Sequence, residues 1–319
     1  MKFKLLILII PIVLVLMSFA IFLFVKDLFL PLSKGGEEIT VLVPKGSSVT
    51  QIGNILEKNK VIKSGLAFKL YVRLTNSQNK MQAGEFEISP SLSLIEVVES
   101  LEKGPREIFV TIPEGLRKEE IAIKFAKALE KDQKFIDDFL LFSSDKEGYL
   151  FPDTYLFPKS ATATQIVNKM TSTFNSKIKE ITYEQLIVAS MLERETLGDS
   201  EKPIVAGVIY KRLNQGWPLQ IDATLQYAKD NIKYKVVNTE NKYWEPIYLA
   251  DKETDSKFNT YKYLGLPPAP ISNPGFLSLK ATKSPESSDY WYYIHDTKGQ
   301  IHYAKTLDEH NGNIAKYLR

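Results

Sequence analysis

An uncharged apolar run near the N-terminus constrains this chain more than any other feature. It extends from Leu5 to Val25 and reads LLILIIPIVLVLMSFAIFLFV. A helix rises about 1.5 Å per residue, so a run of this length can cross a hydrocarbon layer about 30 Å thick. Pro11 lies inside the run, but membrane helices tolerate proline. The sequence therefore predicts one spanning helix over residues 5–25.

Charges on the two sides of this run predict its orientation. Lys2 and Lys4 precede it, whereas one lysine and one aspartate follow it directly. By the positive-inside rule, residues 1–4 lie in the cytoplasm and the chain after Val25 lies outside. A cleaved signal peptide is the alternative, but the run is longer than the apolar region of such peptides and no small-residue cleavage site follows it cleanly. We expect a single-pass protein of the cytoplasmic membrane with an extracytoplasmic folded part.

Composition excludes several classes of function. The 319 residues carry a formal net charge of only +3, which is too small for the electrostatic field that nucleic-acid binders use. Cysteine is absent, so disulfides, thiolate nucleophiles and cysteine-based metal sites are excluded. The three histidines, at positions 295, 302 and 310, form no closely spaced pair of the kind that holds zinc. The sequence therefore predicts no metal and no nucleic-acid partner.

The exported part begins with a linker and a small α/β module. Residues 26–37 contain proline, glycine and charge without periodicity, as a linker does. After them, Ile39–Val43 reads as a β-branched strand, and Ser48 can cap a helix. The stretch MQAGEFEISPSLSLIEVVESLEKG then predicts a second strand and an amphipathic helix that ends near Gly104. We expect one folded module over residues 38–105.

The pattern of this module returns once along the chain. Ile108–Ile112 is again a strand candidate, and the turn Pro113-Glu114-Gly115 matches the earlier turn Pro44-Lys45-Gly46. Aligning the two turns also pairs the apolar residues of the following helices, Ile52 with Ile121 and Leu56 with Phe125. The sequence therefore predicts two related supersecondary units.

The strand, turn and helix in VPKGSSVTQIGNILEKNKVI resemble the start of a LysM-like fold. LysM is a small βααβ module that many wall proteins use to hold N-acetylated glycans. A packing module without a ligand of its own is equally consistent with this stretch, because such sequences specify fold better than function.

Two glutamates at the end of an apolar helix are the candidate catalytic groups. The helix starts near Tyr183, and its segment LIVASML is apolar nearly all round, which places it in the interior. Glu193 and Glu195 follow. A carboxyl group at the edge of an apolar interior tends to keep its proton near neutral pH and can act as a general acid in glycoside cleavage. The helical periodicity does not show which of the two glutamates is the catalytic acid. The alternative is a structural role for Glu193, in an ion pair with Arg194 or Lys202.

Two later segments carry candidate substrate-binding residues. In WPLQIDATLQY, polar and apolar residues alternate, and an extended segment would put the polar ones on one side of a sugar cleft: Gln220, Asp222 and Thr224. An ordinary half-exposed strand is the alternative. A second polar group comes just before LGLPPAP, whose prolines fix an extended wall: Asn259, Thr260 and Tyr261.

The C-terminal stretch predicts a hairpin and a closing helix. Tyr290–His295 and Gln300–Tyr303 are strand candidates around the turn Asp296-Thr297-Lys298-Gly299. Because the sequence has no GxSxG elbow, the histidines here are interpreted as residues of the hairpin and helix surface.

Several of these strings together resemble the endolytic murein transglycosylase (YceG-like) family. They are EGYLFPDTY, the A-S-x-x-E-x-E-T arrangement from Ala189 to Thr196, PLQIDATLQY, FNTYKYLGLPPAPISNPG and SLKAT, and they cover most of residues 147–283 in order. The resemblance implies an α+β fold with one membrane helix, a LysM-like module over 38–105 and a mixed α+β catalytic domain over 106–319.

The resemblance also implies an activity. Family members cleave the MurNAc–GlcNAc bond inside nascent peptidoglycan strands, leave 1,6-anhydro-MurNAc ends, use no cofactor or metal, and act beside wall synthases of the elongation or division machinery. The family motif places the catalytic acid at Glu193 and leaves Glu195 as a supporting group. It also favours the glycan-binding interpretation of the six polar residues named above.

The residues alone are also consistent with two other functions. A lysozyme-type hydrolase would need a second carboxylate about 5 to 9 Å from the first, and Asp222 is the best candidate for it. A non-enzymatic wall-binding scaffold would tolerate the loss of Glu193.

Overall fold

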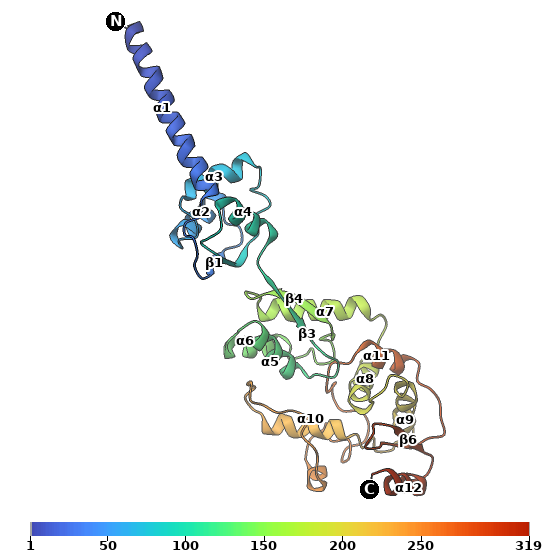
Figure 1. Ribbon diagram of the computed structural model, residues 1–319. Helices are drawn as coiled ribbons and strands as arrows, with labels where there is room; N and C mark the ends of the chain where they lie inside the picture. Colours follow the sequence, from blue (N-terminus) through green and yellow to red (C-terminus); the bar gives the residue numbers. More distant parts are fainter. Residues whose placement is uncertain (1, 319) are drawn as a thin grey trace. The chain divides into compact units, whose positions relative to one another are not determined.

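The computed structural model describes residues 2–318, with side chains from residue 11 onward. The chain forms two compact units (Figure 1). Unit 1 comprises Met1–Ile108 with Phe157–Ser160, and unit 2 comprises Phe109–Leu156 with Ala161–Arg319. The strands of the described part make three two-stranded sheets among many helices, which agrees with the predicted α+β class.

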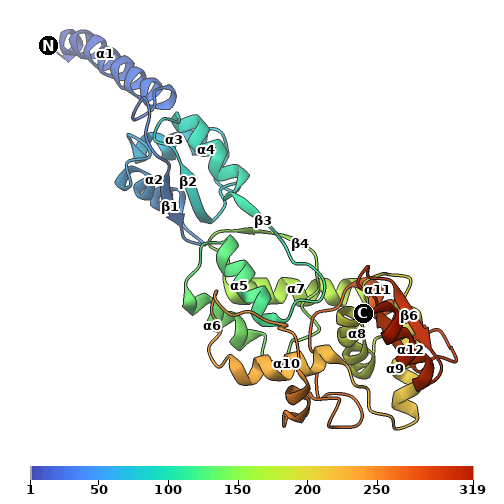
Figure 2. The same ribbon diagram turned by 60° about the horizontal axis from the view of Figure 1, so that its bottom comes forward.

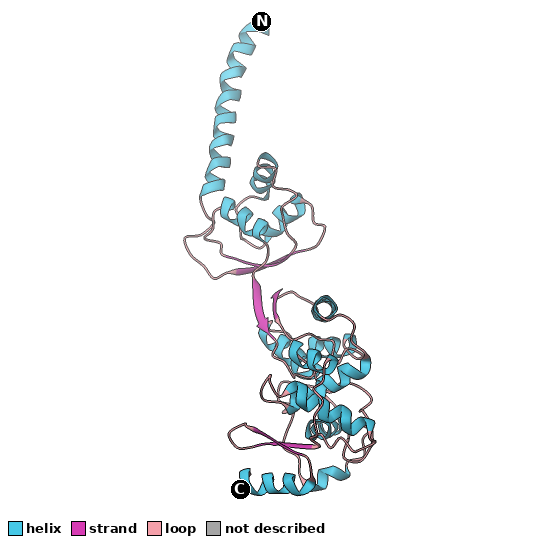
Figure 3. Cartoon of the chain, turned by 90° about the vertical axis from the view of Figure 1, so that its right-hand side faces the viewer, coloured by secondary structure: helices cyan, strands magenta, loops and turns pink. Residues whose placement is uncertain are grey.

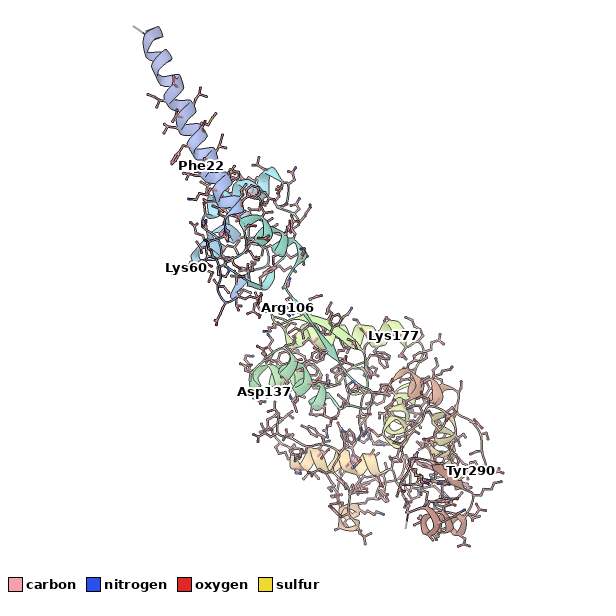
Figure 4. The ribbon with its side chains drawn as sticks, in the orientation of Figure 1. Phe22, Lys60, Arg106, Asp137, Lys177 and Tyr290 are labelled. Atoms are coloured by element: carbon pink, nitrogen blue, oxygen red, sulfur yellow. The ribbon has the colours of Figure 1, made fainter. Side chains whose placement is uncertain are left out.

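The N-terminal apolar run forms helix α1, Lys2–Phe29. Its stretch Pro11–Phe29 has a mean hydropathy of 2.4 and is only 6% buried, so by length and composition it can cross a membrane. Phe22 lies on this helix and is 62% exposed (Figure 4). The helix continues to Phe29, so the first four residues of the predicted linker are helical.

Unit 1 has the order strand, two helices, strand, helix. Its elements are β1 (Ile39–Val43), α2 (Val49–Lys58), α3 (Gly65–Leu74), β2 (Gly84–Ile88) and α4 (Leu94–Lys103). β1 and β2 are antiparallel, with Ile39 opposite Ile88. Serine side chains cap all three helices: Ser48, Ser64 and Ser93. Unit 1 thus has the order βααβ followed by a helix, and its likeness to a LysM module stays a prediction.

The predicted repeat agrees with the structure. The second copy runs through β3 (Glu107–Thr111), α5 (Lys118–Ala128), α6 (Gln133–Phe142) and β4 (Thr154–Pro158), and β3 pairs with β4. The turn glycines have the same left-handed backbone, with φ of 83° at Gly46 and 79° at Gly115. The paired apolar residues of both helices are buried: Ile52, Ile121, Leu56 and Phe125.

The rest of unit 2 packs helices around a central one. These helices are α7 (Ala163–Lys177), α8 (Tyr183–Glu195), α9 (Lys202–Asn214), α10 (Asp222–Lys233), the short 3-10 helix η1 (Leu249–Glu253) and α11 (Phe276–Lys283). All seven residues from Leu186 to Leu192 are buried in α8, as its apolar sequence predicts. α8 packs against both α9 and α11 (Figure 2).

The C-terminal hairpin is confirmed. β5 (Tyr292–His295) and β6 (Ile301–Ala304) are antiparallel, and α12 (Leu307–Tyr317) follows them (Figure 3). Gly299 in the turn has φ of 80°. His302 Nε2 lies 3.0 Å from Asp296 Oδ2, and the imidazole ring stacks on Tyr317, which fits a structural role.

One local prediction is wrong: the segment after Gln220 is not extended. Ile221 is the last extended residue, and helix α10 begins at Asp222. An acidic residue in the first turn interacts favourably with the helix dipole. Ala223 and Tyr227, four residues apart, both face the core. Over so few residues, alternating polarity fits a helix as well as a strand.

Candidate active site

The end of α8 is held in place by a buried serine. The Ser190 hydroxyl donates to the Ile187 carbonyl at 2.7 Å and accepts from the Ile271 N–H at 3.0 Å. The Ser190 carbonyl accepts from the Ser272 hydroxyl at 2.9 Å. These bonds connect the interior of α8 to the segment that leads into α11.

Asn273 joins three motifs that are distant in sequence. Its side-chain N–H groups donate to Leu116 O at 3.0 Å and to Glu147 Oε1 at 2.7 Å. Its Oδ1 accepts from the Leu150 N–H at 2.8 Å, and its backbone carbonyl accepts from the Gly115 N–H at 2.9 Å. The strings EGYLFP and ISNPG and the turn Pro113-Glu114-Gly115 therefore meet at one buried amide.

The carboxyl group of Glu193 has two defined partners. Oε1 lies 3.1 Å from Lys202 Nζ, and Oε2 accepts from the Gly275 N–H at 2.9 Å. The Lys202 ammonium also donates to Thr196 and Ser278 at 3.3 and 3.1 Å. The Glu193 side chain is 8% exposed, so a buried cation and the first turn of α11 fix its orientation. The ion pair considered as a structural alternative is thus present.

A second carboxylate, Glu114, lies beside Glu193. A Cβ atom on Gly275 would stand only 1.7 Å from Glu114 Oε1, and the Phe276 N–H donates to the same side chain. Because both carboxyl groups contact Gly275, their nearest oxygens lie within roughly 8 Å of each other by bond geometry. Burial and the nearby charge of Glu193 raise the pKa of Glu114.

Glu195 points into a different polar cluster. Its Oε2 accepts from the Tyr293 hydroxyl at 2.9 Å, and the Ala223 N–H donates to it as well. Burial, with a contribution from Asp222, raises the pKa of Glu195 to about 7. The Tyr261 hydroxyl in turn donates to Asp222. α8 therefore directs the two glutamates of its last turn into two clusters, and Asp222 belongs with Glu195.

The sequence that forms this site matches a known family: the YceG-like family model matches residues 41–316. The chain belongs to the YceG-like family. It is 31% identical to the endolytic murein transglycosylase of Bacillus subtilis, covering 93% of this chain and 90% of that protein. It is 28% identical to the endolytic murein transglycosylase of Streptococcus pneumoniae, covering 92% of this chain and 61% of that longer protein.

A solved structure agrees with the family membership. A crystal structure of a YceG-like protein from Listeria monocytogenes superposes with a TM-score of 0.54 at 32% identity, covering 88% of this chain and 99% of that one. Among the residues that our structure describes, no group of three or more histidine, aspartate or glutamate side chains is placed to hold a metal ion.

The residues predicted to bind the YceG-type substrate differ in exposure. Gln220 and Asp222 are exposed and Tyr261 is partly buried, all near the start of α10. The other three are buried, with exposed fractions of 1% or less: Thr224, Asn259 and Thr260. They hold the loop before LGLPPAP in place. The hydroxyls of Thr260 in this loop and Thr224 in α10 lie 2.8 Å apart, and Asn259 donates to the carbonyls of Lys252 and Thr254 at 2.9 Å.

Sequence reasoning missed Glu114 and Tyr293 and treated Lys202 only as a structural partner. A signal for Glu114 is present in the repeat, because its turn carries a glutamate where the first copy carries Lys45. Tyr293 has no comparable signal, since aromatic residues in a hairpin are common.

Proposed function

We propose that this YceG-family protein is a membrane-tethered peptidoglycan lytic transglycosylase. It cleaves the MurNAc–GlcNAc bond inside nascent glycan strands, leaves 1,6-anhydro-MurNAc ends, and so terminates or trims strand elongation. The observation that carries the proposal is a buried glutamate, Glu193, whose two carboxyl oxygens are oriented by Lys202 and Gly275. The substrate class, murein (peptidoglycan), is taken from the relatives, which are endolytic murein transglycosylases.

In this proposal Glu193 performs both proton transfers. Its carboxyl proton goes to the glycosidic oxygen as the bond from that oxygen to C1 of MurNAc breaks, and positive charge develops at C1. The resulting carboxylate then takes the proton of the C6 hydroxyl as O6 bonds to C1 and closes the anhydro ring. An attack within the same sugar has the entropic advantage of a tethered nucleophile over water.

Glu195 is the competing candidate for the acid. Its pKa of about 7 suits a group that must hold and release a proton near neutral pH. We assign it a positioning role because it accepts from Tyr293 and lies beside Asp222, where it can fix the start of α10.

Two substitutions separate these assignments. Glu193→Gln keeps the volume and loses the transferable proton, so we expect glycan release from purified sacculi to fall by at least about 100-fold, the usual contribution of a general acid. Glu195→Gln should have a milder effect. The opposite order would make Glu195 the acid, and no glycan release by the parent protein would favour a non-enzymatic scaffold.

Glycan binding would use both exposed and buried polar residues. Gln220, Asp222 and Tyr261 face the strand in our proposal, whereas the buried residues Thr224 and Thr260 keep their loop in register with α10. Helix α1 anchors the chain with its N-terminus in the cytoplasm. The catalytic part then lies outside the membrane, beside the wall synthases of the elongation or division machinery.

A lysozyme-type hydrolase is the second candidate, and the position of Glu114 favours it. The separation of roughly 8 Å or less between Glu114 and Glu193 is compatible with carboxyl spacings in glycoside hydrolases. Asp222, which the sequence suggested for this role, is instead the neighbour of Glu195. The chemistry of the product distinguishes the two candidates.

A further inference from the structure

One face of α3 exposes a row of leucines. Leu66, Leu70 and Leu74 are spaced four residues apart and are 67%, 44% and 73% exposed. The opposite face of the helix, with Ala67, Phe68 and Val72, is buried in the core of unit 1. Exposed faces of helices in water normally carry polar residues, so a leucine row on this face indicates a partner.

The end of α1 belongs to the same core as α3. Leu28 of α1 is buried in the cluster that includes Phe68 and Val72, and Phe24 packs against that cluster. Figures 1 and 2 both show α3 on the side of unit 1 from which α1 leaves, with β1 on the opposite side. Phe24 lies within the run predicted to span the bilayer. A bilayer that contains this run must therefore lie next to α3.

The charges of α3 fit the same neighbour. Besides the leucines, the helix carries Lys69 and Arg73 and no acidic residue. Long basic side chains can lie along an apolar surface and place their charge among lipid headgroups. Leucines combined with basic residues on one short helix are typical of segments that lie in a membrane interface.

We propose that α3 contacts lipid: its leucine row enters the interface of the bilayer that α1 crosses, and Lys69 and Arg73 contact anionic headgroups. The inference rests on the proposed anchoring by α1. Two attachment points hold unit 1 against the membrane surface, whereas a single helix would leave it free to swing.

The absence of cysteine from the chain allows a clean labelling test. Leu70→Cys in the full chain is labelled with a fluorophore and reconstituted in vesicles of phosphatidylglycerol and phosphatidylcholine with brominated acyl chains, which quench only nearby fluorophores. Leu42→Cys is the matched control, because Leu42 is also a leucine of unit 1, is 61% exposed, and lies on β1. Phe22→Cys, at a position of α1 that is 62% exposed, reports on the span itself.

We expect lipid quenching at positions 22 and 70, severalfold stronger than at position 42. Quenching at position 22 but not at 70 would overturn the role of α3 and leave the anchor intact. No quenching at position 22 would overturn both. A blue shift at position 70 that depends on protein density, without lipid quenching, would point to a second copy of the chain as the partner and also overturn the proposal. Cleavage of sacculi by the same preparations tests the enzymatic function separately.

Discussion

Gly275 separates the two carboxylates of the candidate active site. Its φ and ψ of −77° and 174° are open to any residue, so glycine is required here by space and not by backbone conformation. A methyl group would collide with Glu114 while the backbone N–H of the same residue holds Glu193.

We therefore expect Gly275→Ala to lower the free energy of unfolding by about 1 kcal/mol, the low end for overpacking, because the exposed end of Glu114 can move aside. The variant should also reduce cleavage by displacing Glu193. Adding Glu114→Ala removes the colliding side chain, so the double variant should recover most of the stability. Chemical denaturation of the two single variants and the double variant measures this coupling. Additive losses would show that the two residues are not in contact.

A second prediction at this scale concerns the proton on Glu195. Its pKa is about 7 in the folded protein and about 4.5 in the unfolded chain, so the folded state retains a proton that the unfolded state releases. The resulting stability is present below about pH 4.5 and is lost as pH rises through about 7. The Glu195→Gln variant should lose less stability than the parent between pH 5 and pH 8, by up to about 3 kcal/mol. Glu184→Gln, on the exposed side of α8, is the control and should follow the parent.

At the scale of elements, α8 could be predicted from sequence and α10 could not. Seven consecutive apolar or small residues can only be buried, and a helix of that kind places the following glutamates at the edge of the core. The segment WPLQIDATLQY contains too few residues to separate a period of two from a helical period. The helix forms because Ala223 and Tyr227 then fit the core, and that fit depends on residues distant in the sequence.

Asn273 shows how strings that are separate in the sequence lie next to one another in space. Asn273→Ala would leave the buried Leu150 N–H without its acceptor and would remove one of two donors from the Leu116 carbonyl and from Glu147 Oε1. We expect a loss of about 2–4 kcal/mol in the free energy of unfolding, because several buried groups lose partners together. Asn175→Ala, at an exposed position of α7, is the control and should be nearly neutral. Equal stability of the two variants would contradict the role of Asn273 as a junction.

At the scale of the whole molecule, the sequence predicts a membrane helix, a repeated βααβ unit and a helical region that carries the acids. These predictions rest on the periodicity of apolar residues and on turn glycines, which are features of short stretches of sequence. The contact of Glu114 with Gly275 joins residues more than 150 positions apart, and no local pattern encodes it. The site is therefore a property of the assembled unit 2, whereas the anchor belongs to unit 1.

In the proposed mechanism, cleavage closes a ring within the sugar and does not add water. Digesting sacculi with the purified full chain in heavy-oxygen water, followed by mass spectrometry of the products, tests this most directly. The transglycosylase mechanism predicts unlabelled anhydro ends that are lighter by one water than the ends in a lysozyme digest, and their loss in the Glu193→Gln variant. Labelled reducing ends as the main product would contradict the transglycosylase mechanism and would make Glu114 the second carboxylate of a hydrolase.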